Sequence, residues 1–433
     1  MEIKTKKILL LIFDILLAYF SLFLALLIRY RENFAPQIFL KHFFPFSILY
    51  FLWFVVFYIF GLYDFESFKK NLFAKTIGAL SLNFILGVFF FYFVPILKIA
   101  PKTILILNCL IFGILLFGWR KTALSFFSVY LTEKIAILGE KKEVEELEKE
   151  IEKKPYLGYK LERIDLEQNI IEQVKNKEIK IIVFDEKLEK EPKFLEFLLN
   201  SLNYGINFVE FQTFYERIFE KIPIFKISKI WFLENLKEGE KQIYDKFKRI
   251  LDIIFGAIIL VLTLPVWILI AMAIKLEDRG PVFYLQERVG KNKKIFKLIK
   301  FRSMVKEAEK EGPKWAEIED QRVTKVGKFL RRFHLDEIPQ MINVIRGDIS
   351  LVGPRPERPE FVEKLEKEIP YYNLRHIIKP GFTGWAQIKF RYARSIEDSL
   401  EKFQYDLYYI KNRSLFLDLK ILLKTFQLFF KKE

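Results

Sequence analysis

The sequence predicts a membrane protein of mixed α and α/β structure, and three observations indicate this class. The first third of the 433-residue chain contains four long apolar stretches. The middle alternates short apolar strands with charged helices, and the last part is basic and opens with a fifth apolar stretch. Hydrophobic residues make up 52% of the chain and charged residues 29%. Because the two kinds are segregated along the sequence, we expect membrane segments joined to polar domains.

The four apolar stretches of the first third are long enough to cross a bilayer as helices. They lie at residues 8–28, 43–60, 77–97 and 104–119. A helix rises about 1.5 Å per residue and the apolar core of a bilayer is about 30 Å thick, so each stretch spans it with some flanking residues. The first stretch is too long for a cleaved signal peptide, and no small-residue cleavage site follows it. We therefore expect a four-helix transmembrane bundle in residues 1–125.

The basic residues indicate how this bundle is oriented. One end of the helices carries Lys4, Lys6, Lys7, Lys69, Lys70, Lys75, Arg120, Lys121 and Lys134, whereas the other carries Arg29, Arg31, Lys41, Lys98 and Lys102. Because cytoplasmic loops are richer in Lys and Arg, we expect the N-terminus and the downstream domains in the cytoplasm. The net charge of +16 fits anionic lipid and phosphorylated substrates, and we expect no nucleic acid partner. The single cysteine, Cys109, excludes a disulfide framework or a cysteine metal site within one chain.

Residues 130–235 have the pattern of a small Rossmann-like α/β domain. Apolar stretches at 134–138, 179–184 and 206–211 alternate with helical patterns at 141–153 and 194–203, which predicts a parallel sheet. A dinucleotide fingerprint would place glycines at 139, 141 and 144. Only Gly139 is present, with Lys141 and Val144 at the other two positions, so we expect no close approach of a pyrophosphate. The expected role is structural or regulatory.

The fifth apolar stretch, residues 250–275, is expected to form a re-entrant helix. Its only charge before Lys275 is Asp252, so its length alone would allow a fifth span. Basic residues nevertheless stand at both ends, which suits two cytoplasmic ends. Pro265, near the middle, removes one backbone hydrogen bond and can break the helix into two arms. We expect the helix to enter the inner leaflet and return, and a straight fifth span stays open as the alternative.

The C-terminal domain, residues 244–433, is expected to be α-rich. Residues 283–290 and 295–304 predict two strands, and Lys300 and Arg302 share one face of the second, facing solvent if alternation alone decides. Residues 309–320 predict a mobile loop and 357–369 an amphipathic helix. Residues 379–387 predict a turn that either faces a ligand or caps a sheet. Aromatic and leucine residues interleave with Lys and Arg from 396 to 430, which predicts helices at the lipid headgroup boundary.

One stretch combines acids and arginines in a way that suits phosphate chemistry. Asp336 and Glu337 stand between Arg331 and Arg355. Apolar residues recur with helical spacing after Asp336, so we expect a helix with both acids in its first turn. A carboxylate can attack phosphorus or hold Mg²⁺, and guanidinium groups neutralise phosphoryl oxygens. An ordinary helix start is the alternative, since Asp is a common N-cap and an early proline is tolerated.

The order of these motifs resembles the bacterial sugar transferase family, the membrane-bound polyprenyl-phosphate phosphoglycosyl transferases. The resemblance is carried by residues 248–252, Pro265, 280–286, 300–304, 335–337, 347–356 and 379–387. Each motif alone is weak, but together and in order they are specific. The four N-terminal spans and the α/β domain resemble the long form of the family, which starts exopolysaccharide or O-antigen synthesis. The resemblance implies a monotopic catalytic domain in residues 244–433.

The resemblance also implies an activity. A hexose 1-phosphate would pass from a UDP-sugar to undecaprenyl (polyprenyl) phosphate with release of UMP. Asp336 would form a covalent aspartyl-phosphosugar intermediate, Glu337 would be its acidic partner, and both would hold Mg²⁺. Arg331 and Arg355 match phosphate-binding positions, and Lys300 and Arg302 are assigned to the same site. The long form suggests glucose or galactose rather than an acetamido sugar.

The expected location is the bacterial inner (cytoplasmic) membrane, as a multi-pass protein with its catalytic domain on the cytoplasmic face. The expected partners are the UDP-sugar donor, the polyprenyl phosphate acceptor and membrane lipid, and a homodimer is left open. Two other functions also stay open. A scaffold or regulator of polysaccharide assembly without turnover is disfavoured by the intact Asp336–Glu337 pair. A nucleotide-sugar dehydratase or epimerase is disfavoured by the missing glycines.

The chain departs from the family pattern at two places. Many members carry Ser before the helix-breaking proline, where this chain has Leu264 preceded by Thr263. The hydrogen bonding around Pro265 therefore does not follow from the resemblance. Many members also have glycine where Lys293 or Lys294 stands, and we expect this difference to alter only a turn.

Overall fold

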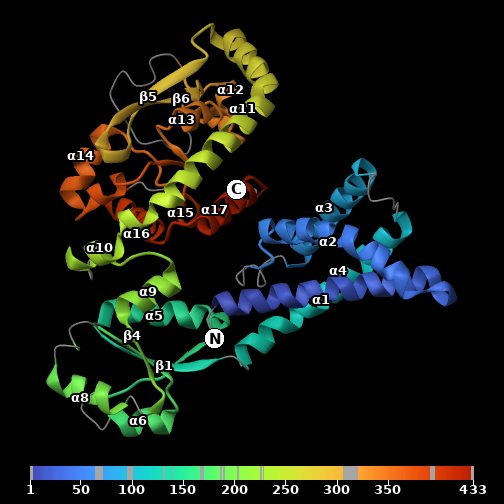
Figure 1. Ribbon diagram of the computed structural model, residues 1–433. Coiled ribbons are helices and arrows are strands. Elements are labelled where there is room, and N and C mark those ends of the chain that lie inside the picture. The colour runs from blue at the N-terminus through green and yellow to red at the C-terminus, as the bar shows by residue number, and fades with distance from the viewer. Residues whose placement is uncertain are drawn as a thin grey trace. The chain divides into compact units, whose positions relative to one another are not determined.

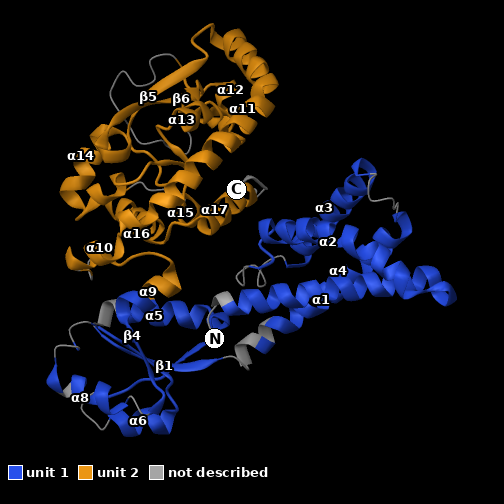
Figure 2. Ribbon diagram, in the orientation of Figure 1, with its two compact units in different colours: residues 1–214 blue, residues 215–433 orange. Residues whose placement is uncertain are grey.

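The computed structural model divides the chain into two compact units, residues 1–214 and 215–433 (Figure 2). The sequence placed the end of the α/β domain later, at residue 235. The difference has a physical reason, because Ile222, Ile224, Ile227 and Phe232 are buried in the core of the second unit. The structure describes residues 3–63, 72–94, 101–129, 132–139, 141–165, 170–185, 188, 191–201, 204–224, 227, 229–305, 320–390 and 395–430. Except for Asp320, the expected loop at 309–320 lies outside these residues.

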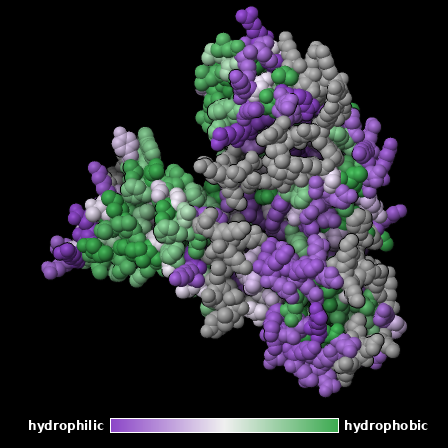
Figure 3. All heavy atoms as spheres, turned by 180° about the vertical axis from the view of Figure 1, so that it is seen from behind, coloured by the Kyte–Doolittle hydropathy of each residue, from purple (hydrophilic) through white to green (hydrophobic). Residues whose placement is uncertain are grey.

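The first unit begins with the four expected apolar helices. They are α1 (Ile3–Tyr30), α2 (Pro36–Ile59), α3 (Leu72–Phe93) and α4 (Lys102–Val129). Apolar side chains gather on their outer surface in Figure 3. Within the described residues, five helices are long and apolar enough to cross a membrane, and the fifth contains the stretch after residue 250. The chain is therefore a membrane protein.

A small parallel sheet follows in the first unit, as the alternating pattern predicts (Figure 1). Its strands run in the order β2-β1-β3-β4, and every neighbouring pair is parallel. The strands are β1 (Glu133–Leu138), β2 (Tyr159–Leu161), β3 (Ile181–Phe184) and β4 (Asn207–Glu210). The helices are α5 (Lys141–Lys153), α6 (Ile170–Lys177) and α8 (Pro192–Ser201), and α9 (Phe211–Phe219) begins in the first unit and ends in the second. The sequence missed the edge strand β2, because three residues are too few for a hydrophobic period. The Rossmann-like assignment stays a prediction.

The second unit contains an antiparallel hairpin of β5 (Phe283–Val289) and β6 (Ile295–Phe301), close to the predicted strands. The hairpin turn contains Asn292 and Lys293, whose φ angles are 54° and 60°. This left-handed region favours glycine, so the departure at Lys293 puts a side chain where the backbone is strained. Further along, β7 (Ser350–Val352) and β8 (Gly381–Thr383) form a short parallel pair. The predicted turn at 379–387 thus contains a strand and the start of a helix.

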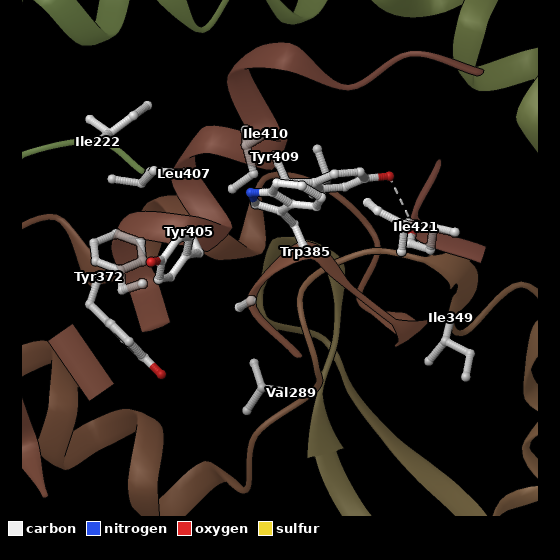
Figure 4. Packing of buried hydrophobic residues seen from close by; sticks show 14 of the residues in the cluster. Ile222, Val289, Ile349, Tyr372, Trp385, Tyr405, Leu407, Tyr409, Ile410 and Ile421 are labelled. Atoms are coloured by element: carbon white, nitrogen blue, oxygen red, sulfur yellow. Dashed lines mark hydrogen bonds between the residues drawn. The ribbon is translucent and has the colours of Figure 1, made fainter. Parts of the chain in front are cut away.

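The core of the second unit lies between this strand pair and the C-terminal helices (Figure 4). The helices are α10 (Lys229–Asn235), α14 (Pro359–Glu368), α15 (Trp385–Lys389), α16 (Ile396–Asn412) and α17 (Leu415–Phe430). Phe403, Leu407 and Ile410 of α16 are buried in this core. The interpretation of 396–430 as lipid-facing is therefore wrong for α16. On α17, by contrast, Phe416 and Leu419 are exposed.

Helix α11 (Gln242–Asp278) continues for 37 residues with Pro265 inside it. Figure 1 shows that it bends in its C-terminal half instead of ending. The Thr263 hydroxyl donates to the carbonyl of Ile259 at 2.7 Å and accepts a hydrogen bond from the Trp267 indole at 3.2 Å. Hydroxyls that bond back along a helix in this way favour a bend. Thr263 therefore supplies the hydrogen bonds near Pro265 that did not follow from the sequence.

Both arms of α11 pack against the same domain. Before Pro265, Asp252 accepts the amide of Leu351 at 3.0 Å. Arg249 donates to the carbonyls of Val344 and Ile345 at 2.6 and 2.5 Å, at the end of the helix α13 (Gln340–Arg346). After the bend, the buried apolar cluster comprises Ile270, Ile274, Phe301 and Leu330. One polar domain thus holds the residues on either side of the bend.

Candidate active site

Asp336 and Glu337 lie in a short 3-10 helix, η9 (Leu335–Glu337), between α12 (Lys325–Arg332) and α13. The expectation that they occupy the first turn of an α-helix is wrong, since α13 begins only at Gln340. The physical reason is Pro339, which has no N–H to donate to the carbonyl of Leu335, four residues earlier. Ile338 closes a tighter turn instead, and its amide donates to that carbonyl at 3.3 Å. The turn buries Asp336 to 7% exposure.

Glu337 is held by two cations from separate elements. Lys300 on β6 donates to its carboxylate at 2.9 Å, and Arg355, after β7, donates at 2.5 and 3.4 Å. Burial opposes ionisation of Glu337, but the charges of Arg355 and Lys300 outweigh burial and hold the pKa of Glu337 well below its ordinary value. Glu337 is therefore a carboxylate at neutral pH. The Lys300 side chain is only 17% exposed, so the solvent-facing interpretation is wrong for it.

Asp336 has a different environment from its neighbour. Burial raises its pKa, and the negative charge of Glu337 adds to this effect. The positive charges of Lys300, Arg331 and His334 act in the opposite direction. Within the described part of the chain, no group donates a hydrogen bond to the Asp336 carboxylate. A carboxylate that is desolvated, close to cations and not held by donors has the properties of a nucleophile.

The other two predicted site residues divide between this cluster and a separate contact. Arg331, in the last turn of α12, donates to the Ser303 hydroxyl at 2.9 Å, and its charge lies near enough to Asp336 to lower the pKa of that acid. Arg302 is buried and forms an ion pair with Asp278 at the end of α11. A Cβ on Gly280 would overlap its guanidinium. The structure therefore brings together Lys300, Arg331, Asp336, Glu337 and Arg355 but directs Arg302 away from them.

The sequence missed a row of polar side chains on β5. Tyr284, Gln286 and Arg288 are partly buried and alternate with exposed residues, so they share the face of the hairpin that carries Lys300. Arg288 donates to the Gln286 side-chain carbonyl at 3.1 and 2.5 Å and to the carbonyl of Pro356 at 3.0 Å. The alternation of polar residues at 284, 286 and 288 was the signal that could have found them.

The residues at this site fit the magnesium ion that the sequence led us to expect. Mg²⁺ is commonly held by one or two carboxylates together with phosphates of the substrate, rather than by a full set of protein ligands. The described residues contain no cluster of three or more His, Cys, Asp or Glu side chains that could hold a metal. Asp336 and Glu337 supply the two adjacent carboxylates that such a shared site needs. Magnesium binding stays a prediction.

Comparison with known proteins finds a family model and several relatives. Residues 243–432 match the model of the family described as bacterial sugar transferase. A UDP-N-acetylgalactosamine-undecaprenyl-phosphate N-acetylgalactosaminephosphotransferase of Aeromonas hydrophila is 47% identical over 217 residues, 47% of this chain and 51% of that protein. A UDP-glucose:undecaprenyl-phosphate glucose-1-phosphate transferase of Klebsiella pneumoniae is 46% identical over 183 residues, 41% of this chain and 39% of that protein.

The matches do not extend over the whole length of these two relatives, since they span about half of the first and less of the second. A shorter relative is covered more fully. The chain is 40% identical over 185 residues to a UDP-glucose:undecaprenyl-phosphate glucose-1-phosphate transferase of Caulobacter vibrioides, 42% of this chain and 68% of that protein. The residues matched by the family model and the candidate site residues both fall in the second unit. The chain therefore belongs to the bacterial sugar transferase family.

Proposed function

We propose that this chain transfers a sugar 1-phosphate from a UDP-sugar to undecaprenyl phosphate and releases UMP. The observation that carries the proposal is the buried Asp336 carboxylate. It lies beside Glu337, and Lys300 and Arg355 hold Glu337 in its ionised form. The names of the relatives support the reaction class, because they act on UDP-sugars and undecaprenyl phosphate. They divide between N-acetylgalactosamine and glucose. The family resemblance alone favours glucose or galactose, and a donor panel decides between the two classes.

The reaction proceeds by two displacements at one phosphorus atom. An Asp336 carboxylate oxygen attacks the phosphorus that carries the sugar and forms an aspartyl-phosphosugar. The bond from that phosphorus to the bridging oxygen breaks, and UMP leaves with the bridging oxygen. A phosphate oxygen of the polyprenyl phosphate then attacks the same phosphorus. The acyl-phosphate bond breaks, the Asp336 carboxylate is restored, and the product is polyprenyl diphosphate sugar.

The cationic residues stabilise charge in both displacements. Arg331 and Arg355 lie near the nucleophile and bind phosphoryl oxygens, while Lys300 keeps Glu337 in place. When bound, Mg²⁺ supplies further positive charge to the diphosphate, and Asp336 and Glu337 are the residues that would hold it. Two sequential displacements also mean that the water-soluble donor and the lipid acceptor need not be bound together.

The proposed location follows from helix α11. Residues on both sides of its bend contact one polar domain, which suits a helix that enters and leaves the same leaflet. The site would then lie at the headgroup plane on the cytoplasmic face of the inner membrane, where the acceptor phosphate is. The exposed apolar side chains of α11, among them Val261, Leu262, Ile268 and Leu269, face lipid in this arrangement.

UMP release from purified protein tests the proposal. The protein is incubated with Mg²⁺, undecaprenyl phosphate and a panel of UDP-sugars that includes glucose, galactose and their acetamido forms. We expect UMP with one class, and covalent labelling of the protein by radiolabelled donor when the acceptor is omitted. Asp336→Asn should abolish both signals, since an amide is a poor nucleophile. Absence of UMP with every donor would leave the scaffold alternative, and labelling of the Asp336→Asn variant would show another nucleophile.

A further inference from the structure

The segment that carries Arg355 has no regular secondary structure, yet its backbone is held on several sides. Residues 353–358 follow β7 and form neither helix nor strand. The carbonyl of Pro354 accepts the amide of Gly381 at 2.8 Å, and the carbonyl of Glu357 accepts the amide of Val289 at 2.9 Å. These backbone contacts flank Arg355 but leave its own carbonyl, and that of Pro356, for other donors.

Two arginines supply those donors, Arg288, which is partly buried, and Arg375, which is buried. Arg375 donates to the carbonyl of Arg355 at 2.9 Å, and Arg288 donates to the carbonyl of Pro356 at 3.0 Å. Guanidinium groups can bind several acceptors at once in a fixed planar geometry. The carbonyl of Arg355, the proposed phosphate-binding arginine, and the carbonyl of the next residue are thus each bound by a guanidinium group, which acts as a rigid cationic fork. Neither fork donates to Asp336 or Glu337.

Each fork is itself held in place. Arg288 uses its Nε and Nη2 on the Gln286 side chain, at 3.1 and 2.5 Å, so that its Nη1 points to Pro356. Arg375 is 3% exposed and donates to Asp406 at 2.9 Å and to the Tyr372 hydroxyl at 2.8 Å. The orientation of both groups is therefore fixed before any substrate binds.

We propose that Arg288 and Arg375 are positioning residues for Arg355: they fix its backbone and so fix where its guanidinium meets the phosphoryl group. The inference rests on the proposed function. Arg288 acts through Arg355 and touches no reacting atom. A phosphate-binding group displaced by about 1 Å can cost about 100-fold in rate, so a loss of the clamp appears in kcat more than in the KM of the donor.

Arg288 is the better residue for a test. Removal of Arg375 would leave the buried Asp406 carboxylate without its partner, which destabilises the fold for reasons unrelated to Arg355. Arg288→Met keeps much of the side-chain volume and removes the donors. Arg288→Lys keeps the positive charge and a donor for the Pro356 carbonyl but loses the planar fork that Gln286 holds. Lys293→Met is the matched control, because Lys293 lies on the same hairpin and its pair with Glu366 is exposed.

The experiment is a double-mutant cycle on the full chain, with UMP release and radiolabelled donor as readouts. We expect Arg288→Met to lower kcat about 10- to 100-fold with little change in KM, Arg288→Lys to recover part of the loss, and Lys293→Met to match wild type. In an Arg355→Met background, Arg288→Met should add less than about 3-fold, since no guanidinium is left to position.

The outcomes separate this inference from the proposed function. Absence of UMP from wild type and from Lys293→Met would overturn the proposed function. Active wild type with an unimpaired Arg288→Met variant would overturn the positioning role alone. If Arg288→Met lowers kcat by the same factor in the Arg355→Met background as in wild type, Arg288 acts independently of Arg355. That result would also overturn the positioning role. If thermal unfolding shows that Arg288→Met does not fold, the same cycle with Arg288→Lys applies the same criteria.

Discussion

Asp336 and Glu337 are neighbours in the chain, yet their surroundings give them opposite tendencies. Ion pairs with Arg355 and Lys300 outweigh the burial of Glu337 and keep its pKa low, whereas burial and the adjacent charge raise the pKa of Asp336. Two carboxylates whose environments separate their pKa values commonly divide the roles at an active site. Glu337 is suited to fixed charge and Asp336 to reaction with phosphorus.

Lys300 and Lys297 provide a matched pair for testing this cluster. Both are on β6, but Lys300 is inward and bonded to Glu337, whereas Lys297 is exposed on the opposite face. Lys300→Met should lower UMP release by about 100-fold, because Glu337 loses one of its two cations and the site loses positive charge. Lys297→Met should stay within about twofold of wild type. Equal losses in both variants, measured at saturating donor, would contradict a specific role for Lys300.

The sequence identified most of this cluster, but it could not separate Lys300 from Arg302. Strand alternation puts both residues on one face, and the acids between two arginines pointed to phosphate chemistry. Strand β6 ends at Phe301, however, and Arg302 pairs with Asp278, which is 24 positions away in the chain. Only the packing of α11 on the hairpin determines that pairing. Arg288 was missed for a similar reason, because its contact with the Pro356 carbonyl, 68 positions away in the chain, depends on packing.

His376 predicts a pH dependence of stability. Burial, with the charges of Arg375 and Lys293, lowers its pKa to about 3, although Glu357 acts in the opposite direction. In the unfolded chain an imidazole titrates near pH 6.5, so below that pH the unfolded state binds a proton that the folded state does not. Stability should therefore fall from about pH 6.5 toward 3, by up to about 1.4 kcal/mol per pH unit.

The midpoint of thermal unfolding in detergent at pH 7, 6 and 5 measures this effect. His376→Gln removes the titrating group at similar length, so its midpoint should fall less over this range than that of wild type. The range stays above the ordinary pKa of most carboxyl groups, whose protonation destabilises proteins at lower pH. Parallel curves for the two proteins would show that His376 is not the group responsible.

At the scale of elements, the bend of α11 depends on Thr263 as well as Pro265. Thr263→Val keeps the shape but leaves the Trp267 indole N–H without its acceptor and the Ile259 carbonyl without the hydroxyl. An unmade hydrogen bond in an apolar setting costs about 1–3 kcal/mol. We expect a lower midpoint of thermal unfolding, by about 2–4 °C per kcal/mol, and Thr263→Ser should keep most of the stability. An unchanged midpoint for Thr263→Val would show that the hydroxyl contributes nothing.

The long elements followed from sequence, and the short ones did not. The apolar helices and the β5–β6 hairpin were predicted because their periods extend over many residues. Edge strand β2 has only three residues, too few to show a hydrophobic period. The tight turn of η9 results from the missing N–H of Pro339, a local effect that cannot be recognised from the spacing of apolar residues. The pattern of α16 resembles that of an interfacial helix, because aromatic residues suit both a protein core and a lipid boundary.

At the scale of the second unit, the contacts of α11 decide how the domain meets the membrane. The helix is about 55 Å long at 1.5 Å per residue, enough to cross a bilayer if it were straight and free. Its first arm is instead tied to α13 and β7 by Arg249 and Asp252, and its second arm to the hairpin and α12. A straight span would separate these partners by the bilayer and strip Asp252 of its amide donor. Re-entry preserves every contact.

Cysteine accessibility tests this arrangement. In a Cys109→Ser background, single cysteines replace exposed Lys246 and Leu276, on either side of the bend, and exposed Arg31, between α1 and α2. We expect a membrane-impermeant maleimide to label Lys246→Cys and Leu276→Cys in inside-out vesicles but not in intact spheroplasts. Arg31→Cys should show the reverse, because one apolar helix separates it from the N-terminus, which we expect in the cytoplasm. Labelling of Leu276→Cys from the outer side, with Lys246→Cys labelled from the inner side, would establish a straight fifth span and contradict re-entry.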